Sequence, residues 1–355
     1  MTKRQMAYLA CTVVAVASGL GAAAPSADHQ RVHWVNPGES IQKAVNSARP
    51  GDTVFLSPGT YHESVRITVP NLTLRGSGSY YTVIVPGATT ANSTCAKAGN
   101  GICVTGTDKS PVKGVTVRSL TLRGFTKQGL WASGTDGLTV QGVTSEKNGQ
   151  WGLAQERSVR GVFRHNLAQN NGDAGLFLSN TVDTEEGARD AKGTVVSHNR
   201  LAGNRIGVTV RRLRNLTVDH NEATGNCTAV FVVGDENKPH VGALSVRRNY
   251  IHANNKLCPK TARLPFLQGS GIVLTGAEDA QVTENTVEDN AGKSPLSGGI
   301  VLFKSFVGAL SQHNEIRDNV LARNSPADLA NRDTTGKGNT FHGNTCAVSE
   351  PAGMC

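Results

Sequence analysis

Short stretches in which hydrophobic and polar residues alternate run through most of the chain, and clusters of Gly and Asn separate them. Two neighbouring examples are residues 194–210, TVVSHNRLAGNRIGVTV, and residues 216–232, LTVDHNEATGNCTAVFV. Period-two alternation between such clusters is typical of short β-strands joined by tight turns. No helical period interrupts these repeats. The pattern therefore predicts an all-β chain.

The same short unit recurs along the sequence. His198-Asn199 and His220-Asn221 stand 22 residues apart, each after one alternation and before the next. Asn residues occupy matching places at positions 166, 199, 221, 249, 285, 319 and 339, and Ser119 and Gly142 are assigned to the same place in two earlier units. Three short strands in so few residues pair best with their counterparts one unit later. The repeat predicts a parallel β-helix of about ten coils around one apolar column.

The repeated Asn has a structural reason at such a turn. Asn tolerates left-handed backbone angles, and its amide can bond neighbouring backbone groups. Strands in a sheet lie about 4.8 Å apart, so the stacked amides can also bond one another. We therefore expect a ladder of Asn side chains along the solenoid.

The ends of a solenoid must be covered, because an open coil exposes both apolar core and strand edge. Residues 34–52 are the predicted N-terminal cap. Within it Ser40 can begin a short helix with one apolar face, which ends at Pro50-Gly51; the face comprises Ile41, Ala44, Val45 and Ala48. Residues 53–345 are expected to form the coils, and residues 346–355 a tail.

The first coils resemble a known family. The matching residues are Ser40-Ile41-Gln42, Ala44, Pro50-Gly51-Asp52-Thr53-Val54, Pro58-Gly59-Thr60-Tyr61, Glu63 and Leu72-Thr73-Leu74-Arg75-Gly76. This stretch resembles exported right-handed β-helix proteins of the pectin-lyase-like superfamily, and also the β-helical domain of nitrous-oxide-reductase accessory proteins. With the Asn repeats, the resemblance covers about residues 34–345. It implies a right-handed parallel β-helix and leaves the activity open, because this scaffold supports lyases, hydrolases, epimerases and binding proteins.

The N-terminus has the features of an export signal. Lys3 and Arg4 precede an apolar run without charge, and small residues follow it. We predict a signal peptide over residues 1–27 and a single domain over residues 28–355, secreted and without a membrane span. The net charge of +9 falls to about +7 without the signal, which favours acidic partners such as uronate polymers or simply solubility. Nucleic acid is disfavoured by the compartment.

Six cysteines remain once Cys11 leaves with the signal. An even count in an exported chain indicates disulfides, and six cysteines allow fifteen connectivities. On the implied scaffold, equivalent turns of adjacent coils lie close enough to be bridged, so we pair Cys227 with Cys258. Cys95 with Cys103 would close an inserted loop, and Cys346 with Cys355 would tie down the tail.

Histidines precede the ladder Asn in three consecutive units, at positions 165, 198 and 220, and Arg248 follows in the fourth. If the Asn points inward, these side chains face solvent one coil apart. His198 and His220 are then candidates for contact with a polyanion, and a row of imidazoles can also hold a metal. The alternative is that His, like Asn, merely suits the turn.

The third strand of each unit presents a second candidate surface. Its outward positions are expected to be Trp131, Phe177, Thr209, Phe231, Val273 and Phe303, opposite inward Leu130, Leu176, Val208, Val230, Ile272 and Ile300. Aromatic side chains on an open face can stack on sugar rings. Trp131, Phe177, Phe231 and Phe303 are the predicted substrate contacts, unless they pack beneath the inserted loops.

Charged loops follow three of these strands, at residues 180–193, 211–215 and 234–242. Asp183, Glu185, Glu186 and Asp235 can hold a hard cation such as calcium, which would neutralise a uronate carboxylate. Arg211, Arg212 or Lys238 can then act as the base of a β-elimination. The alternative is a set of solvated loops with ordinary surface ion pairs.

The predicted function is action on an acidic extracellular or cell-wall polysaccharide by a monomeric protein, with elimination favoured if the protein is an enzyme. Two alternatives remain: a non-catalytic carbohydrate or cell-surface binding protein, and an accessory protein for metal-cofactor assembly. The Asn-Thr-Asp, paired-Asp and Gly-His-Gly signatures of polygalacturonase-type hydrolases are missing, as is the Asp-Pro-His element of alginate-epimerase-type enzymes. Neither hydrolysis nor epimerisation therefore has positive support from motifs.

Overall fold

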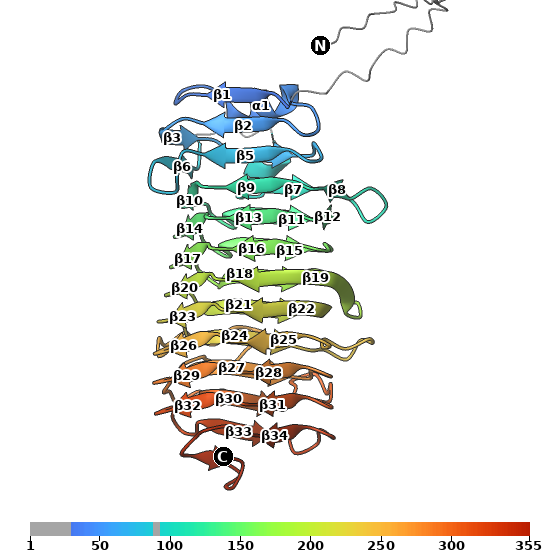
Figure 1. Ribbon diagram of the computed structural model, residues 1–355, viewed down its shortest axis with the longest axis vertical. Coiled ribbons are helices and arrows are strands. Elements are labelled where there is room, and N and C mark those ends of the chain that lie inside the picture. Colours follow the sequence, from blue (N-terminus) through green and yellow to red (C-terminus); the bar gives the residue numbers. More distant parts are fainter. Residues whose placement is uncertain (1–29, 88–92) are drawn as a thin grey trace, which may run out of the picture. The chain divides into compact units, whose positions relative to one another are not determined.

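A computed structural model describes residues 30–87 and 93–355. It contains three parallel sheets of twelve, ten and eleven strands, which stack rung upon rung along one axis (Figure 1). The prediction of a parallel β-helix of about ten coils is confirmed. The predicted signal peptide, residues 1–27, lies outside the described residues. Among the described residues, none of the helices is long and apolar enough to cross a membrane.

The three sheets follow one another in the order A, B, C in every coil except the incomplete ones at the two ends. Sheet A contains β1 (Val32–Val35), β2 (Thr53–Leu56), β5 (Thr73–Gly76), β9 (Thr116–Arg118), β13 (Thr139–Gln141), β16 (Val162–Arg164), β19 (Arg189–Ser197), β22 (Leu213–Asp219), β25 (Ser245–Arg247), β28 (Gln281–Thr283), β31 (Glu315–Arg317) and β34 (Thr340–His342). Sheet B contains β3 (Gly59–His62), β6 (Thr82–Val85), β10 (Thr121–Arg123), β14 (Thr144–Glu146), β17 (Leu167–Gln169), β20 (Arg200–Ala202), β23 (Glu222–Thr224), β26 (Tyr250–His252), β29 (Thr286–Glu288) and β32 (Val320–Ala322).

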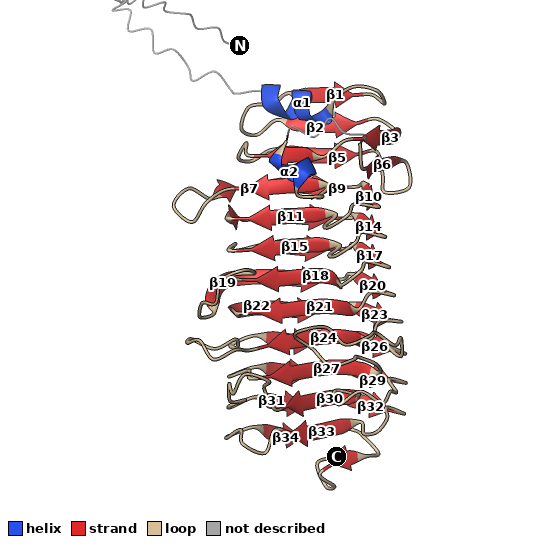
Figure 2. Cartoon of the chain, turned by 180° about the vertical axis from the view of Figure 1, so that it is seen from behind, coloured by secondary structure: helices blue, strands red, loops and turns tan. Residues whose placement is uncertain are grey.

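Sheet C has its longest strands, with six residues each, between its shorter end strands (Figure 2). It contains β4 (Val65–Ile67), β7 (Ile102–Thr105), β11 (Leu130–Ser133), β15 (Leu153–Glu156), β18 (Ala174–Ser179), β21 (Ile206–Arg211), β24 (Thr228–Val233), β27 (Ser270–Thr275), β30 (Gly298–Phe303), β33 (Leu329–Arg332) and β35 (Ser349–Glu350). A two-stranded sheet adds β8 (Val112–Lys113) and β12 (Thr135–Asp136), and two helices are present, α1 (Ile41–Ser47) and α2 (Thr94–Lys97).

The predicted helix is present as α1, but it ends at Ser47, before Pro50-Gly51, and the unpredicted strand β1 precedes it and pairs with β2. The Ser40 side chain accepts a hydrogen bond from the backbone N–H of Lys43, and α1 buries Ile41 and Val45 against the first coil. The Glu63 carboxylate accepts a further hydrogen bond from the Ile41 N–H, at 2.7 Å. The first turn of the helix therefore has its free N–H groups satisfied, as a helix start requires.

One continuous apolar column fills the solenoid. In most strands of sheet A an inward-pointing middle residue is fully buried, as at Val54, Leu74, Val117, Val140 and Phe163. The flanking residues of the same strands point outward. Alternation with period two thus divides every strand between core and surface.

Two Asn ladders mark two of the three corners of each coil. The first joins Asn166, Asn199, Asn221, Asn249, Asn285, Asn319 and Asn344 at the corner between sheets A and B, with amide-to-amide distances of 2.9–3.0 Å. The second lies between sheets B and C and joins Asn148, Asn171, Asn204, Asn226, Asn254, Asn290 and Asn324. Each amide also donates to a backbone carbonyl, so the ladder residues are satisfied although buried.

The predicted ladder needs three corrections. Asn339 belongs to a short third ladder with Asn314, and Asn344 takes its place in the first. Ser119 and Gly142 occupy the left-handed position one residue earlier, with φ values of 57° and 60°. The second ladder was not predicted. It follows a different strand, and the sequence alignment centred on the His-Asn pair did not include it.

The three predicted disulfides are all present, Cys95–Cys103, Cys227–Cys258 and Cys346–Cys355. The second joins the turn before β24 to the loop that precedes β27, residues 253–269, with 6.0 Å between the two Cα atoms. This disulfide holds that loop against the outer surface of sheet C, where the candidate site lies.

Candidate functional site

The outer face of sheet C arranges side chains in columns, because neighbouring strands pair in register. Trp131, Ala154, Phe177, Thr209 and Phe231 stand opposite one another on β11, β15, β18, β21 and β24. The residues predicted to face inward on these strands are all in the core: Leu130, Leu176, Val208, Val230, Ile272 and Ile300. The predicted division of the third strand into an inner and an outer side is therefore confirmed.

Three aromatic rings form a stack on this face. Trp151 lies directly before β15 and extends over the small Ala154, between Trp131 and Phe177. Its ring centroid is 5.9 Å from that of Trp131 and 3.9 Å from that of Phe177. Trp131 is half-exposed at the end of this stack, whereas the other two rings are buried. Trp151 was not among the predicted aromatic contacts, because it precedes the alternating stretch.

The prediction that Phe177 and Phe231 contact a sugar is wrong for this structure. Both project outward, yet only 6% and 1% of their surfaces are exposed. They belong to a second hydrophobic cluster with Leu267 and the Cys227–Cys258 disulfide, beneath the loop of residues 253–269. These aromatic side chains therefore pack under an inserted loop.

Phe303 is half-exposed but does not extend the Phe177 and Phe231 column. Phe303 pairs with Thr275. Val301, two residues earlier on the same strand, pairs with Val273 and stands in the column instead. The register between β27 and β30 is unbroken, so Val301 occupies the aromatic column and Phe303 lies at the end of the strand. Of the four aromatic residues predicted, Trp131 is thus the one that presents a ring to solvent within the stack.

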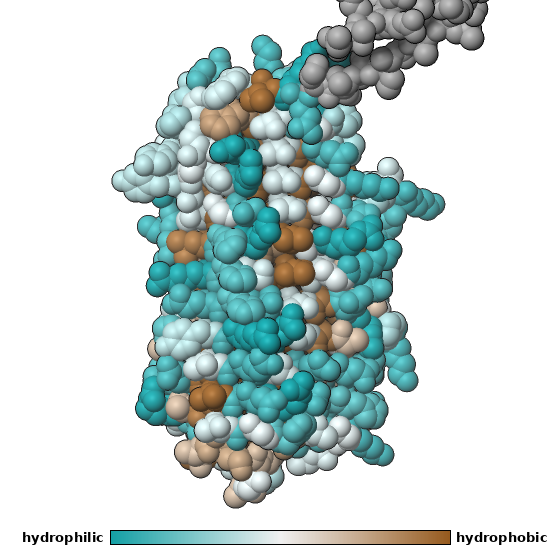
Figure 3. All heavy atoms as spheres, in the orientation of Figure 1, coloured by the Kyte–Doolittle hydropathy of each residue, from teal (hydrophilic) through white to brown (hydrophobic). Residues whose placement is uncertain are grey.

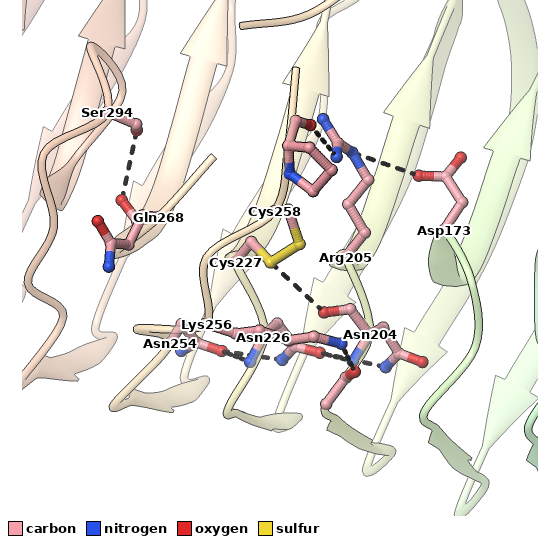
Figure 4. The surroundings of a disulfide bond; sticks show 12 residues. Asp173, Asn204, Arg205, Asn226, Cys227, Asn254, Lys256, Cys258, Gln268 and Ser294 are labelled. Carbon is pink, nitrogen blue, oxygen red and sulfur yellow. Dashed lines mark hydrogen bonds and ion pairs between the residues drawn. A yellow bond between two sulfur atoms is a disulfide. The ribbon is translucent and has the colours of Figure 1, made fainter. Parts of the chain in front are cut away.

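An ion pair between the half-exposed Asp173 and the buried Arg205 borders the stack on the side where these strands begin. The indole N–H of Trp151 donates to Asp173, at 2.9 Å. The Arg205 guanidinium lies 4.0 Å from the same carboxylate (Figure 4). Arg205 also donates to the carbonyl of Pro259, at 2.7 Å, which ties the loop of residues 253–269 to the sheet. Burial raises the pKa of Asp173 and lowers that of Arg205.

Glu156 and Arg211 lie on the opposite side of the stack, in one column with Ser179 between them. The Glu156 carboxylate accepts hydrogen bonds from the Val182 N–H, at 2.9 Å, and from the Ser133 hydroxyl, at 3.4 Å. Burial is the largest influence on this group and raises its pKa. Two strand spacings separate the backbones of Glu156 and Arg211 by about 10 Å.

Arg211 is half-buried, and its pKa is lowered, first by burial and then by the neighbouring charges of Arg212 and Arg263. A guanidinium in such surroundings gains most from an anionic ligand. This is the one of the three predicted bases that faces the candidate site.

Arg212, the second predicted base, does not face the candidate site. It is almost completely buried, pairs with Asp235, and donates to the carbonyl of Thr184 at 2.7 Å and the hydroxyl of Thr181 at 3.2 Å. These contacts hold the loop after β18 in place, so Arg212 is a structural residue here. The third predicted base, Lys238, is exposed in the loop after β24.

The four predicted calcium ligands do not gather. Asp235 pairs with Arg212, Glu185 lies 3.9 Å from Arg212, and Glu186 lies 3.0 Å from Arg157, while Asp183 is exposed. Within residues 30–87 and 93–355, no group of three or more His, Cys, Asp or Glu is placed to hold a metal ion. Glu185, Glu186 and Asp235 are instead paired with arginines, which is the alternative that the sequence left open.

The histidine row is present but lies elsewhere. His165, His198 and His220 are exposed at the corner between sheets A and B, with ring centroids 5.1 and 5.0 Å apart. All three have φ between 51° and 54°, the left-handed conformation that the turn requires. The structure therefore does not bring His198 and His220 together with Trp131.

The geometry limits the chemistry of the face. Asp173 and Glu156 are offset by six residues along adjacent strands, about 20 Å between backbones at 3.3 Å per residue. Paired carboxylates of glycoside hydrolases lie roughly 5–9.5 Å apart. The face is better suited to one acid or base, Glu156, working with a cation, Arg211, beside the aromatic ring of Trp131.

Comparison with known proteins identifies the family. The family model described as "Right handed beta helix region" matches residues 59–186, 183–305 and 242–349, which together span most of the chain. None of the curated proteins matches the sequence.

Solved structures with the same fold share little sequence with this chain. An alginate lyase from a Paenibacillus species has 16% identity and a TM-score of 0.61, with 90% of this chain and 99% of that chain covered. The A-module of a mannuronan C-5 epimerase from Azotobacter vinelandii has 18% identity and a TM-score of 0.54, covering 85% and 90%. DFA-IIIase from Arthrobacter chlorophenolicus, without its lid, has 14% identity and a TM-score of 0.58, covering 90% and 98%.

At these identities the likeness shows the fold alone, a right-handed parallel β-helix. The family match and the stacked parallel sheets agree along most of the chain. The chain therefore belongs to the right-handed β-helix family.

Proposed function

We propose that this protein binds an acidic polysaccharide on the outer face of sheet C and cleaves it by β-elimination at a uronate. The observation that supports this most is the position of the half-exposed Trp131 on the same face as Glu156 and Arg211, whose pKa values burial shifts in opposite directions. Shifted titrating groups beside a sugar-stacking ring are typical of functional sites. The similar folds named as alginate lyase and mannuronan epimerase favour a uronate substrate.

Each residue has a separate task in this proposal. Arg211 binds the uronate carboxylate through its planar fork and thereby acidifies the proton on C5. The Glu156 carboxylate removes that proton, the bond between C4 and the glycosidic oxygen breaks, and a C4–C5 double bond forms. Water supplies the proton that the leaving oxygen takes up. A carboxylate with a raised pKa is a stronger base than an ordinary one. No step is assigned to calcium, because its predicted ligands do not gather.

The test is a polymer panel. Purified protein is mixed with polygalacturonate, alginate or a glycosaminoglycan, and the ultraviolet absorbance of unsaturated products is followed. Glu156→Gln keeps the oxygen that accepts from Val182 but cannot take a proton, so kcat/KM should fall about 10²–10⁴-fold. Arg211→Lys should lower kcat/KM by a comparable factor, since an ammonium group cannot form the two parallel hydrogen bonds that a guanidinium makes to a carboxylate. Chelator should leave the rate unchanged.

Matched controls are Glu222→Gln on β23 and Arg247→Lys on β25, which lie on the other two sheets. Both should keep the activity of the unmodified protein. Absence of unsaturated product from every polymer would refute elimination, as would equal rates for the site variants and the controls.

A second candidate is a binding protein without catalysis. It is favoured by the hydrogen bonds that already occupy both oxygens of Glu156. In that case the polymers are retained without products, and Trp131→Ala weakens retention. Tyr250→Ala, an exposed aromatic residue on sheet B, is the control that should bind normally.

We also propose that the protein is secreted after removal of residues 1–27. Three disulfides support an oxidising compartment. N-terminal sequencing of protein recovered from the culture medium tests this. Retention of the intact N-terminus inside the cell would contradict it.

A further inference from the structure

The outer face of sheet A carries a column of aromatic and basic side chains at its N-terminal end. In register order the column contains Trp34, Phe55, Arg75, Arg118, Gln141 and Arg164, one from each of six consecutive strands. We refer to Arg75, Arg118 and Arg164 as the arginine column. Sheets A and C are different walls of the solenoid, so this surface is separate from the candidate site.

The aromatic end of this column is open to solvent. Trp34 is 65% exposed, and its ring centroid is 4.5 Å from that of Phe55. The Arg75 guanidinium continues the series, with its Cζ atom 5.6 Å from the Phe55 centroid. Such contact holds the guanidinium flat along the sheet and leaves its N–H groups free to bind a ligand.

The charges of the arginine column are not neutralised. Among the described residues, no carboxylate lies within 4.0 Å of Arg75, Arg118 or Arg164. The second outward column of the same strands consists of Val32, Thr53, Thr73, Thr116, Thr139 and Val162, so it adds no negative charge. Arg164 donates to Gln141, at 3.1 Å, which is a neutral partner.

The C-terminal part of the same sheet is different. Arg247 and Arg317 stand farther along the same register column, and both have carboxylate partners: Asp219 at 3.8 Å, and Glu315 and Asp318 at 3.0 and 2.6 Å. Positive charge is therefore unbalanced only toward the capped end of this wall. A stripe of pale and hydrophobic side chains runs down the face that Figure 3 shows, between hydrophilic margins.

We infer that this wall is a second binding surface, for a linear polysaccharide that carries carboxylates and lies along the solenoid axis. Successive rungs advance by about 4.8 Å, close to the length of one pyranose unit, so successive sugars meet successive side chains. Guanidinium groups pair with carboxylates through two parallel hydrogen bonds, and the exposed Trp34 can stack on the end sugar. The neighbouring outward column consists mostly of short Thr side chains, which leaves room for the polysaccharide beside the arginine column.

This surface deepens the proposed function but does not depend on catalysis. It would hold a polymer on one wall while the face of sheet C acts on or binds another segment. The experiment must therefore separate the two walls.

Binding of the full-length protein is measured by affinity electrophoresis in gels containing polygalacturonate, alginate or neutral dextran. The background is Trp131→Ala with Arg211→Gln, which removes the sheet C contacts. This background should still be retarded by the two acidic polymers and not by dextran. Adding Arg75→Gln, Arg118→Gln and Arg164→Gln should weaken the remaining binding roughly tenfold or more, since each exposed ionic contact contributes a small factor.

The matched control adds Arg247→Gln and Arg317→Gln to the same background. These arginines share the column but are already paired, so their loss should change binding less than twofold. Equal weakening in the control and in the arginine-column variant would overturn the inference. So would equal retardation by dextran, or stronger binding to vesicles of anionic lipid than to either polymer.

The outcomes for the two walls are distinguishable. If the sheet C proposal fails, the Trp131 and Arg211 substitutions alone leave both activity and binding unaltered, whereas the arginine column can still be scored. If only the present inference fails, the background variant does not bind at all. Matching thermal unfolding curves for the variants establish that each is folded.

Discussion

At the scale of single residues, the ladder asparagines show how a polar side chain can be essential to an apolar core. Asn221 is buried; its amide donates to the Val196 carbonyl at 2.9 Å, and its oxygen accepts from the backbone and side-chain N–H groups of Asn199. The corner between sheets A and B turns too sharply for the backbone to satisfy these groups alone. The side chain therefore replaces a backbone partner in every coil.

Replacing Asn221 should consequently destabilise the protein strongly. In Asn221→Ala the Val196 carbonyl and the Asn199 N–H are left buried without partners, at a cost of about 1–3 kcal/mol for each group. Denaturant unfolding followed by circular dichroism measures the difference. Asn46→Ala, at an exposed position on α1, is the control and should change the free energy of unfolding by less than about 0.5 kcal/mol. Equal effects would contradict the assigned role.

Asp52 is a charged residue whose contribution to stability also depends on hydrogen bonds made in a buried position. It is buried beneath the cap, and hydrogen bonds from the Arg49 N–H, from His33 and from the Arg31 N–H lower its pKa to about 2. The folded pKa lies below the unfolded value near 3.8. The stabilisation is therefore complete above pH 4 and is lost as the pH falls toward 2.

We expect this contribution to be about 2 kcal/mol at neutral pH. Unfolding free energies of the unmodified protein and of Asp52→Asn, measured between pH 2 and 7, should differ most above pH 4 and converge near pH 2. A constant difference across that range would show that the ionised carboxylate is not responsible.

At the scale of elements, the outer face of sheet C depends on what crosses it. The strands themselves are regular, but the loop of residues 253–269 covers Phe231 and is fastened by the Cys227–Cys258 disulfide and by the bond from Arg205 to Pro259. This loop therefore decides how much of the face a polymer can reach. The open part begins at Trp131 and ends at Arg211.

Removing the disulfide should loosen this cover. Closing a loop of 31 residues restricts the unfolded chain by roughly 3–4 kcal/mol, so Cys227→Ala with Cys258→Ala should lower stability by up to that amount. Limited proteolysis should cut within residues 253–269 earlier than in the unmodified protein. The control, Cys346→Ala with Cys355→Ala, should leave that loop protected. Identical cleavage rates in both variants would contradict the covering role.

The positions of the strands could be predicted from the sequence, but the path of the loop of residues 253–269 over sheet C could not. Alternation at Leu176-Phe177 or Val230-Phe231 shows which residue faces outward, because the period of a strand is two. Whether an outward ring meets solvent depends on a loop from the next coil, and no local pattern indicates its path. Trp151 was missed for a related reason, since it lies ahead of its strand. The charged loops contain the expected residues, but their pairing, such as Arg212 with Asp235, follows from three-dimensional placement.

At the scale of the whole molecule, the described residues between Arg31 and Cys355 form one compact unit around the core cluster inside the solenoid, with a second hydrophobic cluster on the outer side of sheet C. The repeat of Asn and alternating residues predicted this arrangement, because each coil must bury its apolar side against the next. The unpaired arginines on the N-terminal part of sheet A and the paired Arg247 and Arg317 on its C-terminal part could not be predicted, since they depend on which strands become neighbours.

A continuous core should also make unfolding cooperative. Leu176→Ala, in the middle of the column, should cost about 2–5 kcal/mol and shift the entire transition. Tryptophan fluorescence and far-ultraviolet circular dichroism should report the same midpoint. Leu257→Ala, which removes an exposed side chain, should leave that midpoint nearly unchanged. Two separate transitions would show that parts of the solenoid unfold independently.

The amide ladders have a direction. Each Asn nitrogen donates to the oxygen of the next coil, and the second ladder ends where Asn324 donates to the carboxylate of Asp328. Every interior coil thus offers the same acceptor to the coil before it and the same donor to the coil after it. A duplicated segment such as residues 199–220 would join this series without leaving an unmatched group. Gain or loss of whole coils is accordingly the mutational step that this architecture tolerates. The length of its binding surfaces can then change by one coil at a time.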